Sequence, residues 1–232
     1  MIIHGRNAVL EAARAGRVAK VYQAAGAGHD PRLDELAKLA KVEVVPAARL
    51  DAMAPGVNQG VAAELKPRRV WTLKQLLDAR PSLLVALDSI MDPQNLGAIL
   101  RSAEVAGADG AIIPEHRSAP LSPAAVKASS GASELLPIAR VSGLPSAIVE
   151  VKRAGIWCVA LDPRGELNPW DFDFRQPACV VVGSEGTGVQ RLVKERCDAR
   201  VKLPVGGRVA SFNASAAAAA LLYEVMRQRT SS

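Results

Sequence analysis

Buried strand-like segments alternate with helical segments across residues 82–232, and this alternation limits the folds open to the chain. The strand-like runs read LLVALD, GAIIP, LLPIARV, IWCVAL, ACVVVG and ARVKLP. Such alternation is typical of a mostly parallel sheet with helices on both faces. We therefore predict an α/β fold, in which ligands bind beyond the carboxyl ends of the strands.

Residues 1–65 form a second, smaller alternating unit. Asn7–Ala15 has the pattern of a helix, and Asp30 is expected to cap the next one because a proline follows it. Residues 66–81 carry a proline near each end and a short helical pattern between them, which indicates a structured connector. The predicted domains are thus 1–65 and 82–232, joined by this linker.

The positive charge of the chain favours an acidic partner. The formal net charge is +6 and the sequence pI is about 9.5, so nucleic acid is the expected partner. Basic residues gather in two clusters, which are either solvated surface or contacts to RNA phosphates: Lys66, Arg68 and Arg69, and Arg191, Lys194, Arg196, Arg200, Lys202 and Arg208. Aromatic residues make up only 3%, so we expect RNA to be held by backbone charge and shape more than by stacking.

Several classes of protein are excluded by what the sequence lacks. No segment offers the roughly 18 uncharged apolar residues of a membrane helix, and the N-terminus does not resemble a signal peptide, so we expect a cytoplasmic protein. The cysteines Cys158, Cys179 and Cys197 are odd in number and far apart, and we expect buried free thiols. The three histidines show no metal-ligand spacing, so no metal site is expected.

A glycine-rich loop follows the run Val180–Val182 and reads GSEGTG. Its three glycines allow positive φ and a close approach of a ligand to the main chain. The loop lacks the lysine of a phosphate-binding Walker loop and does not match G-x-G-x-x-G. Because Glu185 would repel a pyrophosphate, the loop favours an uncharged or cationic nucleoside-like ligand.

The segment DPQNLGAILRSAEVAG predicts a second group of functional side chains. Its apolar residues recur at helical spacing, and Arg101 lies off that stripe. We expect Arg101 to reach back over Gly97, where the missing side chain leaves room for a ligand beside the guanidinium. A guanidinium fork suits a phosphate or ribose. The alternative is a surface arginine paired with Glu104.

The third segment, LPVGGRVASFNAS, passes from a strand through two glycines to the last helix. Ser211 or Asn213 is expected to cap that helix. The same side chains at a helix start also suit a polar clamp on a substrate hydroxyl. Both interpretations remain open at the level of the sequence.

Together the three segments resemble the SpoU group of the SPOUT superfamily, RNA ribose 2′-O-methyltransferases that use S-adenosylmethionine. The first family motif, N-x-G-x-x-x-R, matches Asn95, Gly97 and Arg101. The second, G-x-E-x-x-G, matches Gly183, Glu185 and Gly188. The third, P-x-x-G-x-x-x-S-x-N-x-S, matches Pro204, Gly207, Ser211, Asn213 and Ser215. HGRNAVLEA and NQGVAAEL resemble the small α/β, ribosomal-protein-like RNA-binding domain of the 23S rRNA guanosine-methylating branch. Two positions depart from the usual pattern, namely Asn58 in place of histidine and Phe212 in place of leucine.

The resemblance implies a C-terminal trefoil knot, a homodimer and a cleft for a bent S-adenosylmethionine. Donor-binding residues would be Gly183, Gly188, Leu203 and Phe212. Catalytic residues would be Asn95, Arg101, Glu185, Ser211 and Asn213. Because guanidinium groups stay protonated, we expect Arg101 to act as an electrostatic partner of a phosphate and the developing alkoxide.

The expected function is methylation of a ribose 2′-hydroxyl in 23S rRNA, of a guanosine. A tRNA ribose methyltransferase is an alternative, as is a non-catalytic RNA-binding or ribosome-assembly protein of the same fold. A dinucleotide oxidoreductase is disfavoured, because G-x-G-x-x-G and its later ribose-binding acid are missing.

Overall fold

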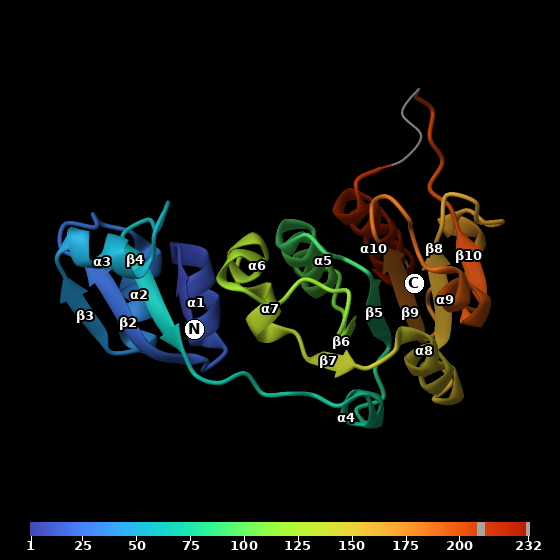
Figure 1. Cartoon of the computed structure of the whole chain (residues 1–232), viewed down its shortest axis with the longest axis horizontal. Helices are drawn as coiled ribbons and strands as arrows, with labels where there is room; N and C mark the ends of the chain where they lie inside the picture. The colour runs from blue at the N-terminus through green and yellow to red at the C-terminus, as the bar shows by residue number, and fades with distance from the viewer. Residues whose placement is uncertain (208–211, 231–232) are drawn as a thin grey trace.

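Two β-sheets organise the chain, which the computed structural model describes over residues 1–207 and 212–230 (Figure 1). The smaller sheet has the strand order β1-β4-β2-β3, and the larger has the order β10-β8-β9-β5-β6-β7. The strands are β1 (Ile2–His4), β2 (Val18–Ala24), β3 (Val42–Val45), β4 (Val61–Leu65), β5 (Leu83–Asp88), β6 (Gly110–Pro114), β7 (Ile138–Val141), β8 (Trp157–Leu161), β9 (Ala178–Gly183) and β10 (Ala199–Val201). The helices are α1 (Arg6–Arg14), α2 (Pro31–Leu39), α3 (Ala47–Met53), α4 (Leu73–Asp78), α5 (Pro93–Val105), α6 (Pro123–Ala128), α7 (Ala132–Leu135), α8 (Leu144–Arg153), α9 (Arg191–Arg196) and α10 (Ala214–Thr230), with a 3₁₀ turn at Pro169–Asp171.

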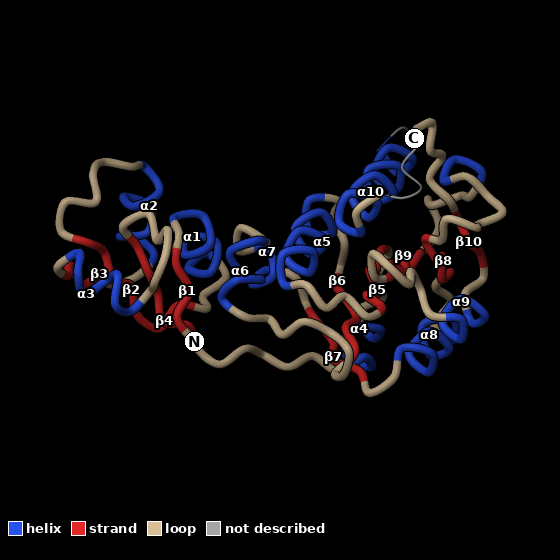
Figure 2. Tube along the Cα trace, turned by 45° about the horizontal axis from the view of Figure 1, so that its top comes forward, coloured by secondary structure: helices blue, strands red, loops and turns tan. Residues whose placement is uncertain are grey.

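The larger sheet is parallel at each of its strand pairings. Its central strands β5 and β9 are buried along their whole length, as expected for strands covered on both faces. α5 and α10 pack side by side on one face, and α4, α8 and α9 cover the other (Figure 2). The predicted α/β architecture with a mostly parallel sheet is therefore confirmed, whereas the knot stays a prediction.

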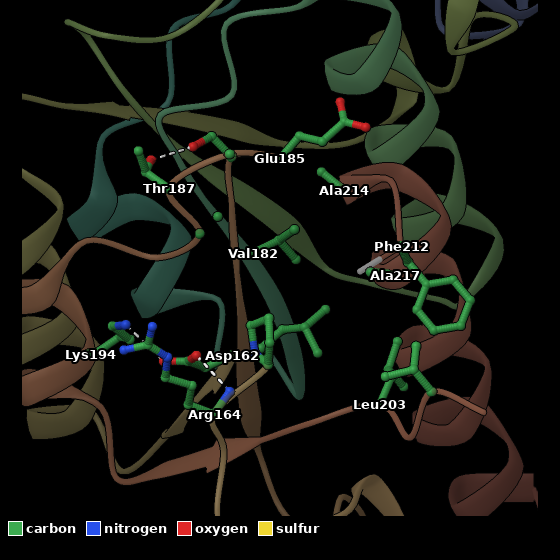
Figure 3. Close-up of a pocket in the computed structure, with 17 residues that line it drawn as sticks. Asp162, Arg164, Val182, Glu185, Thr187, Lys194, Leu203, Phe212, Ala214 and Ala217 are labelled. Atoms are coloured by element: carbon green, nitrogen blue, oxygen red, sulfur yellow. Dashed lines mark hydrogen bonds and ion pairs between the residues drawn. The ribbon is translucent and has the colours of Figure 1, made fainter. Parts of the chain in front are cut away.

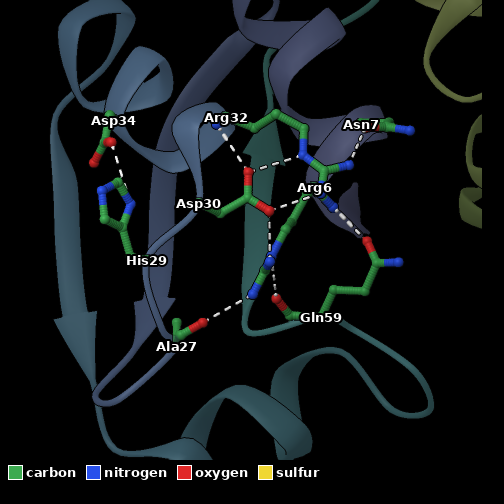
Figure 4. A network of polar contacts seen from close by, with 8 residues as sticks. All are labelled: Arg6, Asn7, Ala27, His29, Asp30, Arg32, Asp34 and Gln59. Atoms are coloured by element: carbon green, nitrogen blue, oxygen red, sulfur yellow. Dashed lines mark hydrogen bonds and ion pairs between the residues drawn. The ribbon is translucent and has the colours of Figure 1, made fainter.

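The smaller sheet carries α1 and α2 on one face and α3 on the other. Asp30 caps α2 as predicted, accepting a hydrogen bond from the backbone N–H of Arg32 at 2.9 Å. Its carboxyl group also accepts from the guanidinium groups of Arg32 and Arg6, each at 2.6 Å (Figure 4). Hydrogen bonds from Arg32, and then from Arg6, hold the pKa of Asp30 well below its ordinary value. Arg6 in turn bonds Gln59, so this network joins three loops at one end of the sheet.

The two units contact each other through α6 and α7, which lie against β1 and α1 (Figures 1 and 2). Val126 of α6 is fully buried and belongs to the apolar core of the smaller unit. Gly131, with φ +91°, leaves no room for a side chain, because a Cβ would lie 2.5 Å from the Cβ of Glu11. The larger unit therefore supplies part of the surface that buries α1.

A buried carboxylate reinforces this contact. Glu134 of α7 has a side chain with 0% exposure and accepts hydrogen bonds from Arg17 of the smaller unit, at 2.8 Å, and from Arg68 of the linker. Arg68 also donates to the carbonyl of Ser133. Removing one partner of such a buried ion pair lowers the stability of the fold strongly, because it leaves the other charge buried without a counter-charge.

This contact removes Arg68 from the Lys66, Arg68 and Arg69 cluster, which the sequence left as either solvated surface or contacts to RNA phosphates. Arg68 is engaged by Glu134, and Lys66 donates through Nζ to the carbonyl of Gly16 at 2.9 Å. Arg69 stacks over the ring of Trp71, with 4.0 Å from its Cζ to the ring centroid. The first two of these cations hold the linker in place, which sequence proximity alone could not reveal.

The remaining expectations about composition can be compared with the described residues. Cys158 and Cys179 are buried and all three cysteines are free thiols, as predicted, and burial raises the pKa of Cys197 to about 12. Over residues 1–207 and 212–230, no three His, Cys, Asp or Glu side chains gather as a metal site would require. Within the same ranges, none of the helices combines the length and apolar character needed to cross a bilayer.

Candidate active site

The three segments that carry the family motifs meet at the amide side chain of Asn213. Asn213, just before α10, donates through Nδ2 to Oδ1 of Asn95 at 3.0 Å and to Oε1 of Glu185 at 3.3 Å. These residues lie 118 and 28 positions from Asn213 along the chain. The structure thus brings together three of the five predicted catalytic residues, while their roles stay predictions.

Asn213 is also the cap of α10. Its Oδ1 accepts from the backbone N–H of Ser215 at 2.9 Å and from the Ser215 hydroxyl at 2.6 Å. One amide side chain therefore fixes the start of α10 with its oxygen and joins the first turn of α5 to the glycine-rich loop with its nitrogen. Ser211, the other predicted cap and a predicted catalytic residue, lies outside the described residues.

The loop after β9 needs bare backbone at two positions for two different reasons. A Cβ on Gly183 would lie 2.0 Å from the carbonyl carbon of Gly188 and 2.1 Å from the nitrogen of Val189. The loop folds back this tightly because the N–H of Gly188 donates to the carbonyl of Ser184 at 2.8 Å. Gly188 itself adopts φ +66°, a left-handed conformation that favours glycine.

Sequence reasoning missed the residue that anchors this loop. Asp88, at the end of β5, is 1% exposed and accepts from the backbone N–H of Gln190 at 2.6 Å and from its side-chain Nε2 at 3.0 Å. The available signal was a carboxylate at the end of the otherwise apolar run LLVALD, since a buried charge requires partners. Asp88 thereby ties the end of β5 to the start of α9, where the glycine-rich loop ends.

A first cavity of about 470 Å³ opens beside the glycine loop (Figure 3). Gly183 and Gly188 line it, and the predicted donor-binding side chains Leu203 and Phe212 lie at its α10 side. Val182 adds a further apolar side chain. The cavity therefore combines an apolar wall with exposed main chain, which suits a flat ring system.

The opposite side of the first cavity is polar. Lys194 of α9 pairs with Asp162 at 2.8 Å, and the backbone N–H of Arg164 donates to the same carboxylate at 2.9 Å. Burial acts to raise the pKa of Asp162, but hydrogen bonds from Lys194 and Arg164 outweigh it and hold the pKa below its ordinary value. Asp162 is therefore a stable anion in the cavity wall, and one cation of the second basic cluster is engaged there.

A second cavity of about 420 Å³ lies across the same loop. Ser184, Glu185, Gly186, Thr187 and Ala214 line both cavities. Asn95 lines only the second, together with Arg117 from the loop after β6 and the connection from β5 to α5. The Asn95, Asn213 and Glu185 contact therefore lies where the two cavities adjoin.

The structure places Arg101 differently from the other predicted residues. Arg101 is exposed on α5, forms no ion pair with Glu104, and is not among the described residues that line either cavity. The room expected beside Gly97 is also filled, because a Cβ there would lie 2.5 Å from the carbonyl oxygen of Ala125 and 2.5 Å from the Cβ of Ala128. Gly97 lets α5 and α6 pack closely, so that expectation was wrong.

Two family profiles match this chain and together cover most of it. The profile described as the SpoU rRNA Methylase family matches residues 82–223. The profile described as RNA 2′-O ribose methyltransferase substrate binding matches residues 2–71.

Curated proteins and solved structures are similar to this chain over most of its length. A 23S rRNA (guanosine-2′-O-)-methyltransferase, RlmB, of Pseudomonas syringae is 39% identical over 92% of this chain and 89% of its own. A TrmH-family protein of Bacillus subtilis named as a tRNA/rRNA methyltransferase, YacO, is 40% identical over 97% and 94%. The structure of the SpoU methyltransferase AviRb of Streptomyces viridochromogenes, in complex with AdoMet, superposes with a TM-score of 0.83 at 29% identity, covering 100% of this chain and 91% of that one.

Proposed function

The chain belongs to the SpoU rRNA methylase family, and from that premise we propose that it methylates the ribose 2′-hydroxyl of a guanosine in 23S rRNA. Family membership makes it an S-adenosylmethionine-dependent RNA 2′-O-methyltransferase, and the proposal concerns its substrate. The observation that carries the proposal is the match to RlmB of Pseudomonas syringae over both parts of the chain. The Bacillus subtilis relative, named for tRNA or rRNA, keeps tRNA as the second candidate.

The first cavity fits S-adenosylmethionine in size, shape and charge. Its volume lies in the range of about 300–1000 Å³ that is usual for small-molecule sites. Leu203 and Phe212 would hold the adenine between apolar surfaces, while main chain at Gly183 and Gly188 would bond its edge. Glu185, at the end shared with the second cavity, suits a cationic centre. When bound, S-adenosylmethionine supplies a methyl group from its sulfonium.

The residues of this chain would then position and polarise the ribose. Asn95 and Glu185, both bonded to Asn213, would fix the loop and the acceptor relative to each other. Asn213 and Ser211 would hold the ribose, and positioning of this kind supplies much of the rate gain in group transfer. Arg101 would contact the neighbouring phosphate and the developing alkoxide, with the proton leaving to that phosphate or to water.

The proposal also gives each domain of the chain a function. Residues 1–65 would bind RNA, residues 66–81 would join the domains, and residues 82–232 would perform the transfer, in the cytoplasm. A homodimer and the C-terminal knot belong to the same proposal. In support of pairing, Val105 of α5 and Tyr223 of α10 are 67% and 64% exposed on helices that pack together.

Methylation of defined transcripts tests the substrate. We expect purified protein to transfer labelled methyl groups to a fragment of 23S rRNA, and mass spectrometry of the digested product to locate the label on the ribose of a guanosine. Label on tRNA transcripts, with none on rRNA fragments or on ribosomal precursor particles, would replace the proposal with the tRNA alternative.

A further inference from the structure

The second cavity has a wall that the proposed chemistry does not use. Arg117, from the loop between β6 and α6, lines this volume of about 420 Å³ together with Asn95 and Glu185. Among the described residues Arg117 forms no hydrogen bond or ion pair, although most other arginines of the chain do. Its guanidinium is therefore available to a ligand in this cavity.

The backbone at Arg117 adopts a conformation that is unfavourable for residues other than glycine. Arg117 adopts φ +56°, and Ser89, which lines the same cavity, adopts φ +61°. Residues other than glycine enter this left-handed region only where their surroundings hold them, and such positions cluster at functional sites. The two loops are tied together by the N–H of Ala119, which donates to the carbonyl of Ile90 at 2.7 Å. Ser89 is further held by Nε2 of Gln190 at 2.7 Å.

The other side chains that line the second cavity suit a nucleobase as the ligand. Met91, 64% exposed, presents an apolar thioether at the cavity, and no aromatic side chain of the described residues lines it. A nucleobase in this cavity would therefore have the Met91 thioether against its face, while the guanidinium of Arg117 reaches its edge. The shared loop Ser184–Thr187 places such a base next to whatever occupies the first cavity.

We infer that the second cavity receives the target nucleotide turned out of the RNA, and that Arg117 selects guanine by donating two hydrogen bonds to its O6 and N7. Guanine presents two acceptors at that edge, whereas adenine presents N7 and an amino donor, and a guanidinium has no acceptor for that donor. The inference rests on the proposed guanosine substrate and adds the residue that selects it. Arg117 is thus assigned specificity, distinct from the transfer chemistry at Asn95, Glu185 and Asn213.

Base analogues at the mapped target position test the contact directly. The wild-type protein is expected to methylate RNA with inosine there almost as well as guanosine, since inosine keeps O6 and N7. With 2-aminopurine, which keeps N7 but lacks O6, kcat/KM should fall by about 10- to 100-fold, the range expected for losing one hydrogen bond to a charged group. In Arg117→Gly, which accepts the left-handed backbone, guanosine and 2-aminopurine should become nearly equal substrates.

Matched variants separate the possible outcomes. Arg80→Gly is the control, because Arg80 is also exposed with φ +53° but lines neither cavity. Arg117→Lys keeps the charge without the fork and should retain little discrimination. If Arg117→Gly discriminated as the wild type does, or instead weakened calorimetric binding of S-adenosylmethionine, the inference would be overturned. If the wild type methylated no guanosine of 23S rRNA, the proposed function would fail first, before any variant was compared.

Discussion

Gly183→Ala is expected to remove most of the affinity of this protein for S-adenosylmethionine. The added methyl carbon would lie 2.0 Å, 2.1 Å and 2.3 Å from three backbone atoms of Gly188 and Val189, none of which can rotate away. The loop would have to move, and it carries Glu185 and lines both cavities. Overpacking of this kind costs about 1–3 kcal/mol, so we expect the dissociation constant to rise by about tenfold or more in calorimetric titration.

Gly186→Ala is the matched control for this prediction. Gly186 lies in the same loop, lines the same cavities, and has no atom within 4 Å of the position of an added Cβ. Its donor affinity should stay within about twofold of the wild type, because surface changes of this kind cost about 0.5 kcal/mol or less. Equal losses in the two variants would show that the tight return of the loop at Gly183 is not what shapes the donor site.

Arg101→Ala is expected to lower the single-turnover rate of methyl transfer by about 10²- to 10³-fold. The expected role is to stabilise charge that develops only during transfer, so donor affinity should change little. Arg101 is exposed on α5, the helix whose first turn brings Asn95 to the second cavity, and it is not paired with Glu104. From there its guanidinium would meet a phosphate that flanks the bound nucleotide.

Two further variants sharpen this prediction. Arg101→Lys should recover little activity, because a lysine is a point charge without the planar fork. Arg153→Ala removes another exposed helical arginine, on α8, and should leave the rate unchanged. A wild-type rate in Arg101→Ala would make this arginine a surface residue and would refute its assigned role in transfer.

Local patterns predicted the elements and caps of this fold well. Asp30 followed by proline was recognised as a helix start, and the buried runs of β5 and β9 as strands, because these signals lie within a few residues. The four-residue helix α7 was missed, and its last residue, Leu135, had been included in the strand that begins only at Ile138. Helices this short bury too few residues to show a period.

Contacts between distant residues could not be predicted in the same way. Nothing near Arg68 in the sequence indicates that Glu134, 66 residues away, holds it. The space at Gly97 was assigned to a ligand, whereas α6 fills it, because a glycine in a helix suits either use. The motif spacing grouped Asn95, Glu185 and Asn213 through family resemblance, but only the structure shows the amide of Asn213 bonded to the other two.

The central claim is that these residues serve transfer of a methyl group to a ribose oxygen of RNA. Its most direct test is the single-turnover reaction with two 23S rRNA fragments that differ in one atom, the 2′-oxygen of the mapped target nucleotide. With the ribose substrate we expect one methyl group per RNA, and with the 2′-deoxy substrate none above background, although both RNAs bind with similar affinity. Methylation of the 2′-deoxy fragment at the wild-type rate would mean that the acceptor is a base atom and would contradict the account.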